Sequence, residues 1–160
     1  MRLRYDAICG LFCGACEVML ANKQGNVSAL AQVWGVESGK LTCYGCKSSI
    51  NAVYCRDCHF RICAGERGIE YCSQCSDFPC ASLLEFSRDN NDHHAAVLQN
   101  LDDLDKMGLK QWLQTQQARW SCPDCGTEFS WYDRICKTCG NRLFNCEEEN
   151  KMNADGNKER

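Results

Sequence analysis

The chain has 160 residues, a formal net charge of −3 and sixteen cysteines, which inflate its hydrophobic content to 44%. This length accommodates one domain, or one domain with a small module, and its thin aliphatic core must be supplemented by disulfides or metal ions. The lack of a basic excess argues against the phosphate-binding surface of a nucleic-acid-binding protein.

The N-terminus indicates which kind of stabilisation to expect. Arg2 and Arg4 are not followed by the apolar run of a secretory signal peptide, and no segment reaches the roughly 18 apolar residues of a membrane span. We therefore expect a cytoplasmic protein without a membrane partner. In the cytoplasm disulfides are rare, and cysteine-rich patterns indicate metal sites.

The first region, residues 1–81, contains eleven cysteines and is expected to be a knuckle region with two short helices, at 16–24 and 28–34. Leu30, Val33 and Trp34 give the second helix an apolar face at helical spacing. We expect this face to pack in the core.

The same region contains an internal repeat. Cys55-x2-Cys58-x4-Cys63 recurs seventeen residues later as Cys72-x2-Cys75-x4-Cys80. A repeat this short predicts two equivalent knuckles rather than a solenoid.

Residues 77–119 carry one cysteine and are expected to be helical. Asp77 is a candidate N-cap, and Pro79 suits the first turn, where its missing N–H costs nothing. A second helix is predicted over 92–108, with glycine as its stop, and a third over 109–119.

Residues 120–146 match a small zinc ribbon, because Cys122, Cys125, Cys136 and Cys139 form two Cys-x-x-Cys-Gly turns. Aromatic residues between the turns suit a hairpin, namely Phe129, Trp131 and Tyr132. Four thiolates close the coordination shell, so the ion is expected to be structural, and Cys146 lies outside the set. Residues 147–160 are too polar to order themselves and are expected to be a disordered tail.

The N-terminal cysteines are further candidate metal ligands. Four Cys-x-x-Cys pairs supply two complete four-thiolate sites, and two thiolates at this spacing can bind one tetrahedral ion. These pairs are Cys13 with Cys16, Cys43 with Cys46, Cys55 with Cys58, and Cys72 with Cys75.

Three cysteines remain outside these pairs, namely Cys9, Cys63 and Cys80. They form a possible third set with an open coordination position, where water or substrate would bind. Alternatively, some of them replace members of the paired sites, or all three are inert buried side chains. His59 could complete a site, although an exposed histidine is the simpler interpretation.

An iron–sulfur cluster is the alternative to zinc in this region. Cys9-x3-Cys13-x2-Cys16 has the ligand spacing of radical-SAM enzymes, but the chain lacks the length and the βα repetition of their barrel. A [4Fe–4S] cluster outside that fold is compatible with the cysteines, because thiolates ligate it too.

The ordered set of eleven N-terminal cysteines, with Pro79 before Cys80, resembles domain of unknown function 3795. The resemblance covers residues 5–120, and the closing ribbon is similar to an appendix that some members carry. It implies a prokaryotic, cysteine-rich protein that binds zinc, and it implies no catalytic residues.

Together these observations predict a small metal-stabilised α+β protein. Its expected parts are a cysteine-rich domain at 1–119, the ribbon at 120–146 and the tail. We expect a binding protein rather than an enzyme: an interaction or regulatory module that holds several zinc ions and binds a protein rather than a nucleic acid. The alternatives are an iron–sulfur or open-site metalloprotein with redox or enzymatic activity, and a metal store or sensor.

Overall fold

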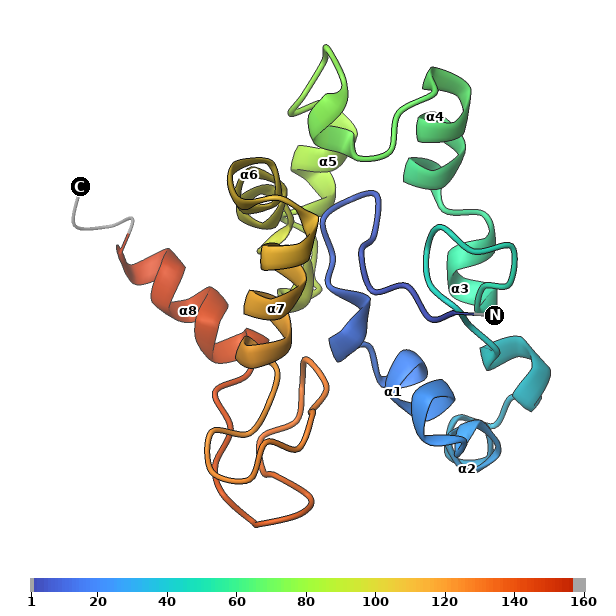
Figure 1. Cartoon of the computed structure of the whole chain (residues 1–160), viewed down its shortest axis with the longest axis vertical. Coiled ribbons are helices and arrows are strands. Elements are labelled where there is room, and N and C mark those ends of the chain that lie inside the picture. The colour runs from blue at the N-terminus through green and yellow to red at the C-terminus, as the bar shows by residue number, and fades with distance from the viewer. Residues whose placement is uncertain (1, 157–160) are drawn as a thin grey trace.

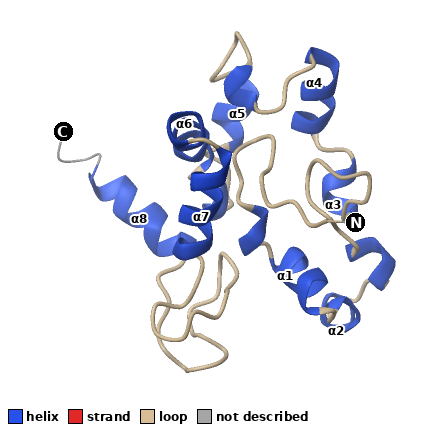
Figure 2. Cartoon of the chain, viewed as in Figure 1, coloured by secondary structure: helices blue, strands red, loops and turns tan. Residues whose placement is uncertain are grey.

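The computed structural model describes residues 2–156, and within them the chain is helical, with loops between short helices (Figures 1 and 2). The α-helices there are α1 (Glu17–Gln24), α2 (Val27–Trp34), α3 (Val53–Arg56), α4 (His59–Arg67), α5 (Ala81–Phe86), α6 (Val97–Met107), α7 (Leu109–Arg119) and α8 (Cys146–Gly156). Four 3₁₀ turns join them: η1 (Cys13–Ala15), η2 (Ser38–Leu41), η3 (Cys72–Gln74) and η4 (Asp92–His94).

The expected α+β class is wrong, because the described residues contain no β-strand (Figure 2). Backbone pairing between extended segments is limited to isolated bridges, of which Ser121–Glu128 and Ile135–Arg142 lie in the expected ribbon. The predicted zinc-ribbon hairpin therefore does not form. Of the aromatic residues assigned to the hairpin, Phe129 is buried in the main core, and the Trp131 N–H donates to the Ala15 carbonyl at 3.0 Å.

The main core forms around the loop that precedes η1. Phe12 meets Trp112 of α7 edge to face, with 6.0 Å between ring centroids, and both side chains are buried. Gly10 approaches α6 so closely that an added Cβ would lie 2.6 Å from the Val97 carbonyl oxygen, and its φ of +91° favours glycine. The loop is thus packed against α6 and α7, and Figure 1 shows it in the centre of the molecule.

A chain of amide hydrogen bonds fastens this loop. Asn100 donates to the Gly10 carbonyl at 2.9 Å and accepts from the Gln116 amide at 3.0 Å. The Trp120 indole N–H then donates to the Gln116 oxygen at 3.3 Å. Burying these groups is tolerated because each is paired.

A smaller core joins α1 and α2 to η2. Val18, Met19 and Leu41 are buried there, and the Asn22 side chain donates to the Leu41 carbonyl at 2.8 Å. The outer face of α2 was expected in this core, but Val33 is 82% and Trp34 39% exposed. That expectation is wrong for Val33 and Trp34 but holds for Leu30, which is partly buried and packs against this core beside the buried Ala31.

The helical segment after Cys75 begins later than predicted. Asp77 does not cap a helix: α5 begins at Ala81 with Cys80 as its N-cap, and the Asp77 carboxylate pairs with Arg67 at 2.8 Å. The third predicted helix is confirmed as α7, and the second as α6, which ends before Gly108. Residues 92–94 form the separate turn η4 before it.

The predicted disordered tail is wrong for its first part, because α8 extends to Gly156; residues 157–160 lie outside the described residues. Asn145 caps the helix by accepting the Glu148 N–H at 3.2 Å. Glu149 pairs with Arg119 of α7 at 3.1 Å, so contacts with neighbouring segments order this polar helix.

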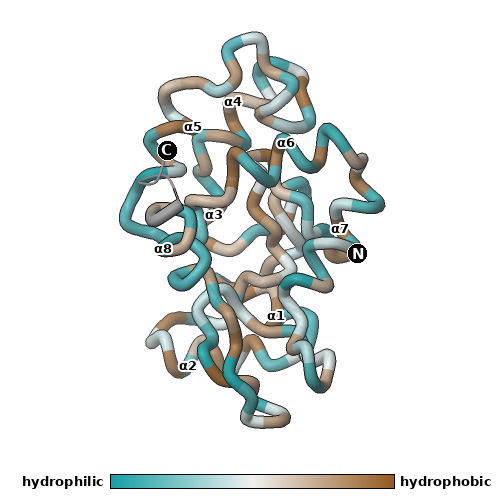
Figure 3. The backbone as a smooth tube through the Cα atoms, turned by 90° about the vertical axis from the view of Figure 1, so that its left-hand side faces the viewer, coloured by the Kyte–Doolittle hydropathy of each residue, from teal (hydrophilic) through white to brown (hydrophobic). Residues whose placement is uncertain are grey.

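Figure 3 shows hydrophobic segments running through the middle of the molecule. The main core includes Trp120, Phe129 and Leu143 together with N-terminal residues, so 120–146 packs as part of the same unit. None of the described helices combines the length and hydrophobicity that crossing a membrane requires.

Candidate metal centres

Four cysteines converge at the end of the molecule beyond α7. The sulfur atoms of Cys122, Cys125, Cys136 and Cys139 all lie within 4.8 Å of one another. The Cys122–Cys139 and Cys125–Cys136 sulfur pairs are each 3.6 Å apart. Tetrahedral zinc with Zn–S bonds of about 2.3 Å separates its sulfurs by about 3.8 Å, so these residues fit one ion.

Two similar turns build this four-cysteine site. In the first, the Cys122 N–H donates to the Thr127 carbonyl at 2.8 Å; in the second, the Cys136 N–H donates to the Asn141 carbonyl at 2.8 Å. The glycine after the second cysteine of each turn has a φ of +74° or +76° and so permits the reversal. The sequence thus predicted that these four cysteines converge, although not the surrounding backbone.

The four thiols and nearby hydrogen-bond donors perturb one another's ionisation in this site. Hydrogen bonds with Thr127 lower the pKa of Cys125 to about 6, and backbone N–H groups of Cys139 and Thr138 lower the pKa of Cys136. A backbone N–H of Asn141 favours the Cys139 thiolate, but burial and the neighbouring thiols outweigh it and raise its pKa to about 12. Four adjacent thiols cannot all ionise unless a cation offsets their repulsion.

Cys146 stays outside the four-cysteine site, in agreement with the sequence prediction for these ligands. Its side chain is buried at the start of α8. Burial and nearby carboxylates raise the pKa of its thiol to about 12, so it is a structural side chain rather than a thiolate.

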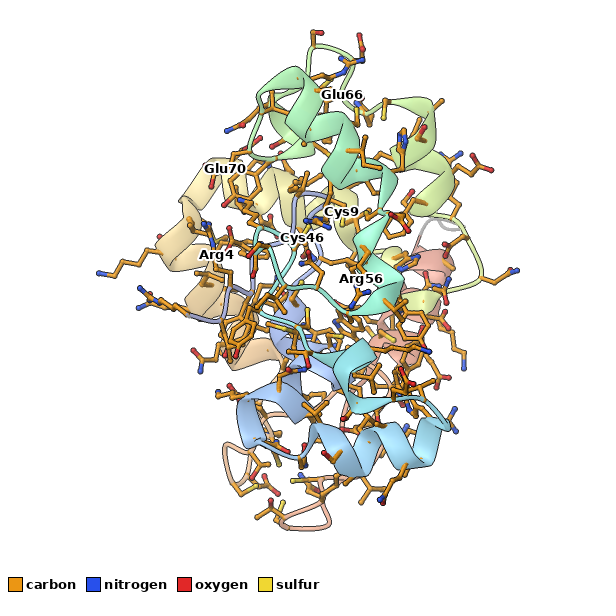
Figure 4. The ribbon with its side chains drawn as sticks, turned by 90° about the vertical axis from the view of Figure 1, so that its right-hand side faces the viewer. Arg4, Cys9, Cys46, Arg56, Glu66 and Glu70 are labelled. Carbon is orange, nitrogen blue, oxygen red and sulfur yellow. The ribbon has the colours of Figure 1, made fainter. Side chains whose placement is uncertain are left out.

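The N-terminal cysteines gather around the central loop without closing as tightly. Within residues 2–156, no group of three or more of their sulfurs falls within 4.8 Å. Burial raises the pKa of Cys9, and the neighbouring thiols of Cys46, Cys58 and Cys72 raise it further. Figure 4 shows Cys9 and Cys46 close together in the middle of this face.

Cys13 lies where the two cores meet and is packed against both. Burial raises its pKa well above the ordinary value, and Cys16, Cys46 and Cys9 add to the effect. The thiols that act on Cys13 thus include its own pair partner Cys16, Cys46 from another pair, and Cys9, which belongs to no pair.

A separate set surrounds a cavity of about 30 Å³ between α4 and α5. Its cysteines are Cys63, Cys72, Cys75 and Cys80. The proposed trio is thus divided, because Cys63 and Cys80 share this cavity with the 72/75 pair, whereas Cys9 is not among the residues that line it. His59, the histidine singled out in the sequence, lies on the cavity wall.

The two copies of the repeat do not form equivalent knuckles. In the first copy Cys58 precedes α4 and Cys63 lies inside that helix. In the second copy Cys72 begins η3 and Cys80 precedes α5. The copies differ because the residues between Cys58 and Cys63 are helical, whereas in the second copy the helix begins only after Cys80.

A signal that the sequence reading overlooked is the placement of cysteines at helix starts. Cys16, Cys58 and Cys80 are the N-cap residues of α1, α4 and α5. Although burial raises the pKa of Cys16, N–H groups of Met19 and Val18 act in the opposite direction. The helix N-terminus thus offsets part of the effect of burial, although the pKa of Cys16 stays above its ordinary value.

A buried carboxylate ties the cysteine-bearing segments together. Asp6 accepts hydrogen bonds from Arg4 and Lys47, each at 2.9 Å, and from the Tyr71 hydroxyl at 2.8 Å. Burial alone would raise its pKa, but these donors outweigh burial and hold the pKa below the ordinary value. Gly45 fits beneath this network, since an added Cβ would lie 2.0 Å from the Arg4 carbonyl oxygen.

Comparison with protein-family models gives a match for the N-terminal half of the chain. No curated protein and no solved structure matches the chain. A family model described as Protein of unknown function (DUF3795) matches residues 5–85, a shorter span than the residues 5–120 expected from the cysteine pattern. The match contains all eleven N-terminal cysteines and spans half of the chain. The chain therefore belongs to the DUF3795 family.

Proposed function

We propose that this protein is a zinc-binding interaction module in which Cys122, Cys125, Cys136 and Cys139 hold a structural zinc ion. The observation that carries the proposal is the convergence of four sulfurs within 4.8 Å at the end of one compact chain. Four thiolates fill a tetrahedral shell and leave no position for substrate, as in structural rather than catalytic zinc sites.

Zinc is favoured over other metals by the ligands and their spacing. Tetrahedral sulfur sets select zinc or iron–sulfur centres. Two sulfur pairs at 3.6 Å match the separation around a single ion and leave no room for a cluster of several iron atoms between them. Reduced thiols are also consistent with a cytoplasmic location, which forms part of the proposal.

A protein partner is supported by apolar side chains that remain on the surface. Val33, Trp34 and Tyr54 are 82%, 39% and 63% exposed, and the two aromatic rings meet edge to face at 6.0 Å. Exposed apolar groups of this kind mark interaction surfaces when they are contiguous. A nucleic-acid partner is disfavoured because four thiolates on one zinc add two negative charges to a chain that is already acidic.

Metal analysis of the purified full chain tests the zinc assignment. Cys136→Ser should lose one zinc ion relative to the wild type, whereas Cys146→Ser, a buried cysteine outside the site, should retain the full complement. Equal zinc content in the wild type and Cys136→Ser, or iron in place of zinc, would refute the assignment.

The interaction surface requires a different experiment. A protein captured by the wild type should be lost with Val33→Asp and retained with Met152→Asp, an exposed apolar residue on α8 (65% exposed). If the two variants capture the same proteins as the wild type, this surface is not the binding site.

A further inference from the structure

We propose a second metal site, for one zinc ion, formed by Cys63, Cys72, Cys75 and Cys80 in the cavity between α4 and α5. The inference rests on the proposed zinc-binding function and adds a site with its own ligands and its own counter-charge. It differs from the pairing expected from the sequence, because one Cys-x-x-Cys pair here combines with two cysteines from elsewhere in the repeat.

The fold delivers these four thiols from separate elements. Cys63 lies on α4, Cys72 and Cys75 bracket η3, and Cys80 immediately precedes α5. All four are partly buried and line the same cavity, but as a set their sulfurs are farther apart than the 4.8 Å of the first site, so an ion would draw them inward.

The ligand types admit one zinc ion or a cluster. Four thiolates are the donor set of structural zinc and also ligate iron–sulfur centres. The remaining wall of the cavity is apolar, with Phe60, Phe78 and Leu83 beside the thiols. The proposed occupant is a single zinc ion, and iron with sulfide in the purified protein would overturn this assignment.

An arginine next to one sulfur supplies the independent observation. The Arg67 guanidinium donates a hydrogen bond to the Cys75 sulfur, with 2.9 Å between N and S. The Asp77 backbone N–H also points to this sulfur, at 3.4 Å. Hydrogen bonds of this kind, from side-chain and backbone N–H groups to a sulfur, are the outer-shell contacts that metal-bound cysteines make.

The arginine is itself held in position. Its guanidinium pairs with the Asp77 carboxylate at 2.8 Å, and Arg67 is the last residue of α4, the helix that carries Cys63. Zinc bound by four thiolates has a net charge of −2, so a fixed cation at the ligand shell lowers the electrostatic cost of binding. Outer-shell partners of this type orient metal ligands and tune affinity.

His59 is the competing ligand, because its side chain also lines the cavity. It begins α4, and its ring packs against Phe60 with centroids 5.4 Å apart. The four-thiolate assignment requires that His59 stay out of the shell. Substitution of the histidine therefore distinguishes a four-cysteine site from a three-cysteine, one-histidine site.

Zinc counting on full-length variants tests the ligand set. Cys63→Ser, Cys75→Ser and Cys80→Ser should each bind one zinc ion fewer than the wild type, and His59→Ala should bind the wild-type number. The double variant of Cys63 and Cys80 should still lose only one ion. Loss of two ions by the double variant, or loss of one by His59→Ala, overturns the assignment.

A second variant leaves all ligands and the fold in place. Arg67→Gln should weaken the binding of one ion by about 10–100-fold in a chelator competition, the usual effect of removing an outer-shell partner. Lys106→Gln is the control, because Lys106 forms an exposed ion pair with Asp102 on α6, away from the thiols. Unchanged affinity of every ion in Arg67→Gln would contradict the proposal.

The two sites are separable in the same measurement. Cys136→Ser removes the ion of the site beyond α7, so combining it with Cys75→Ser should remove two ions from one chain. If Cys136→Ser loses an ion while Cys75→Ser loses none, the second site is refuted and the proposed function stands. If Cys136→Ser loses no ion, the proposed function itself is refuted.

Discussion

Replacing Asp6 with asparagine tests whether the buried carboxylate holds the cysteine-bearing segments together. The side chain of Asp6 is 4% exposed and accepts hydrogen bonds from Arg4, Lys47 and Tyr71. Asparagine has nearly the same shape but no charge, so the substitution removes the counter-ion of Lys47, whose side chain is 9% exposed.

The expected loss of stability follows from these contacts. Removing one member of a buried ion pair typically costs about 3–5 kcal/mol, because the remaining charge is left without its partner. Lys47 keeps a second partner, Glu70, at 3.0 Å, and its ammonium lies 3.3 Å from the centre of the Tyr71 ring. We therefore expect the lower end, about 3 kcal/mol, which corresponds to a fall in Tm of about 6–12 °C for a chain of this size.

The assay is thermal unfolding followed by circular dichroism at a fixed free zinc concentration, because bound metal contributes to apparent stability. Asp102→Asn is the matched control: it removes the exposed partner of Lys106 within α6 and should cost at most about 0.5 kcal/mol. If Asp6→Asn unfolds at the same temperature as this control, the network does not stabilise the fold.

The same network fixes a direction for the pH dependence. The folded pKa of Asp6 is lowered, so its contribution to stability is present above the pKa of the unfolded chain, near 3.8, and is lost as the pH falls through the folded value. Asp6→Asn lacks this group. The stability difference between the wild type and the variant should therefore narrow in acid, and a difference that grows below pH 4 would refute the reasoning.

Three other perturbations follow from single contacts. Gly10→Ala should destabilise the protein by at least ~2 kcal/mol, because φ is +91° and the new Cβ would clash with the Val97 carbonyl, whereas Gly25→Ala, with open space around it, should cost less in urea denaturation. Burial lowers the pKa of His93 to about 4, so its ring should remain neutral at pH 5.5 in an NMR titration. The folded state holds this histidine neutral, so the stability of the protein should fall as the pH is lowered from about 6.5 to about 4. A titration midpoint near 6.5 would contradict this. Asn145→Ala should reduce helical circular dichroism by fraying α8, at a cost of about 1 kcal/mol, and an unchanged spectrum would exclude its role as a cap.

The helices were predictable where local pattern and packing agree. The stretch 97–107 has apolar residues at helical spacing, and Val97, Leu101 and Leu104 are buried on one face of α6. The exposure of Val33 was not predictable, because apolar spacing identifies a face without saying whether another element covers it. The order of α8 depends on Arg119, a residue far away in sequence, although Asn145 followed by three glutamates was an unused capping signal.

The site beyond α7 could be read from spacing because its ligands come from two adjacent turns. Its backbone could not, since Phe129 and Trp131 pack against the N-terminal half, which short-range patterns do not reveal. The N-terminal cysteines pose the opposite problem. Cys63 and Cys75 are brought to one cavity by α4 and η3, and only the path of the chain decides such a grouping.

The shared core limits how this chain can be shortened during evolution or in the laboratory. The residues that match the family end at 85, yet Phe12 and Leu83 are buried in one core with Trp112 and Phe129. A gene truncated after residue 85 would encode a polypeptide with that apolar surface uncovered, prone to aggregation or to pairing with another copy. The two halves should therefore be expressed, lost or transferred together, and a short relative must cover the same surface in another way.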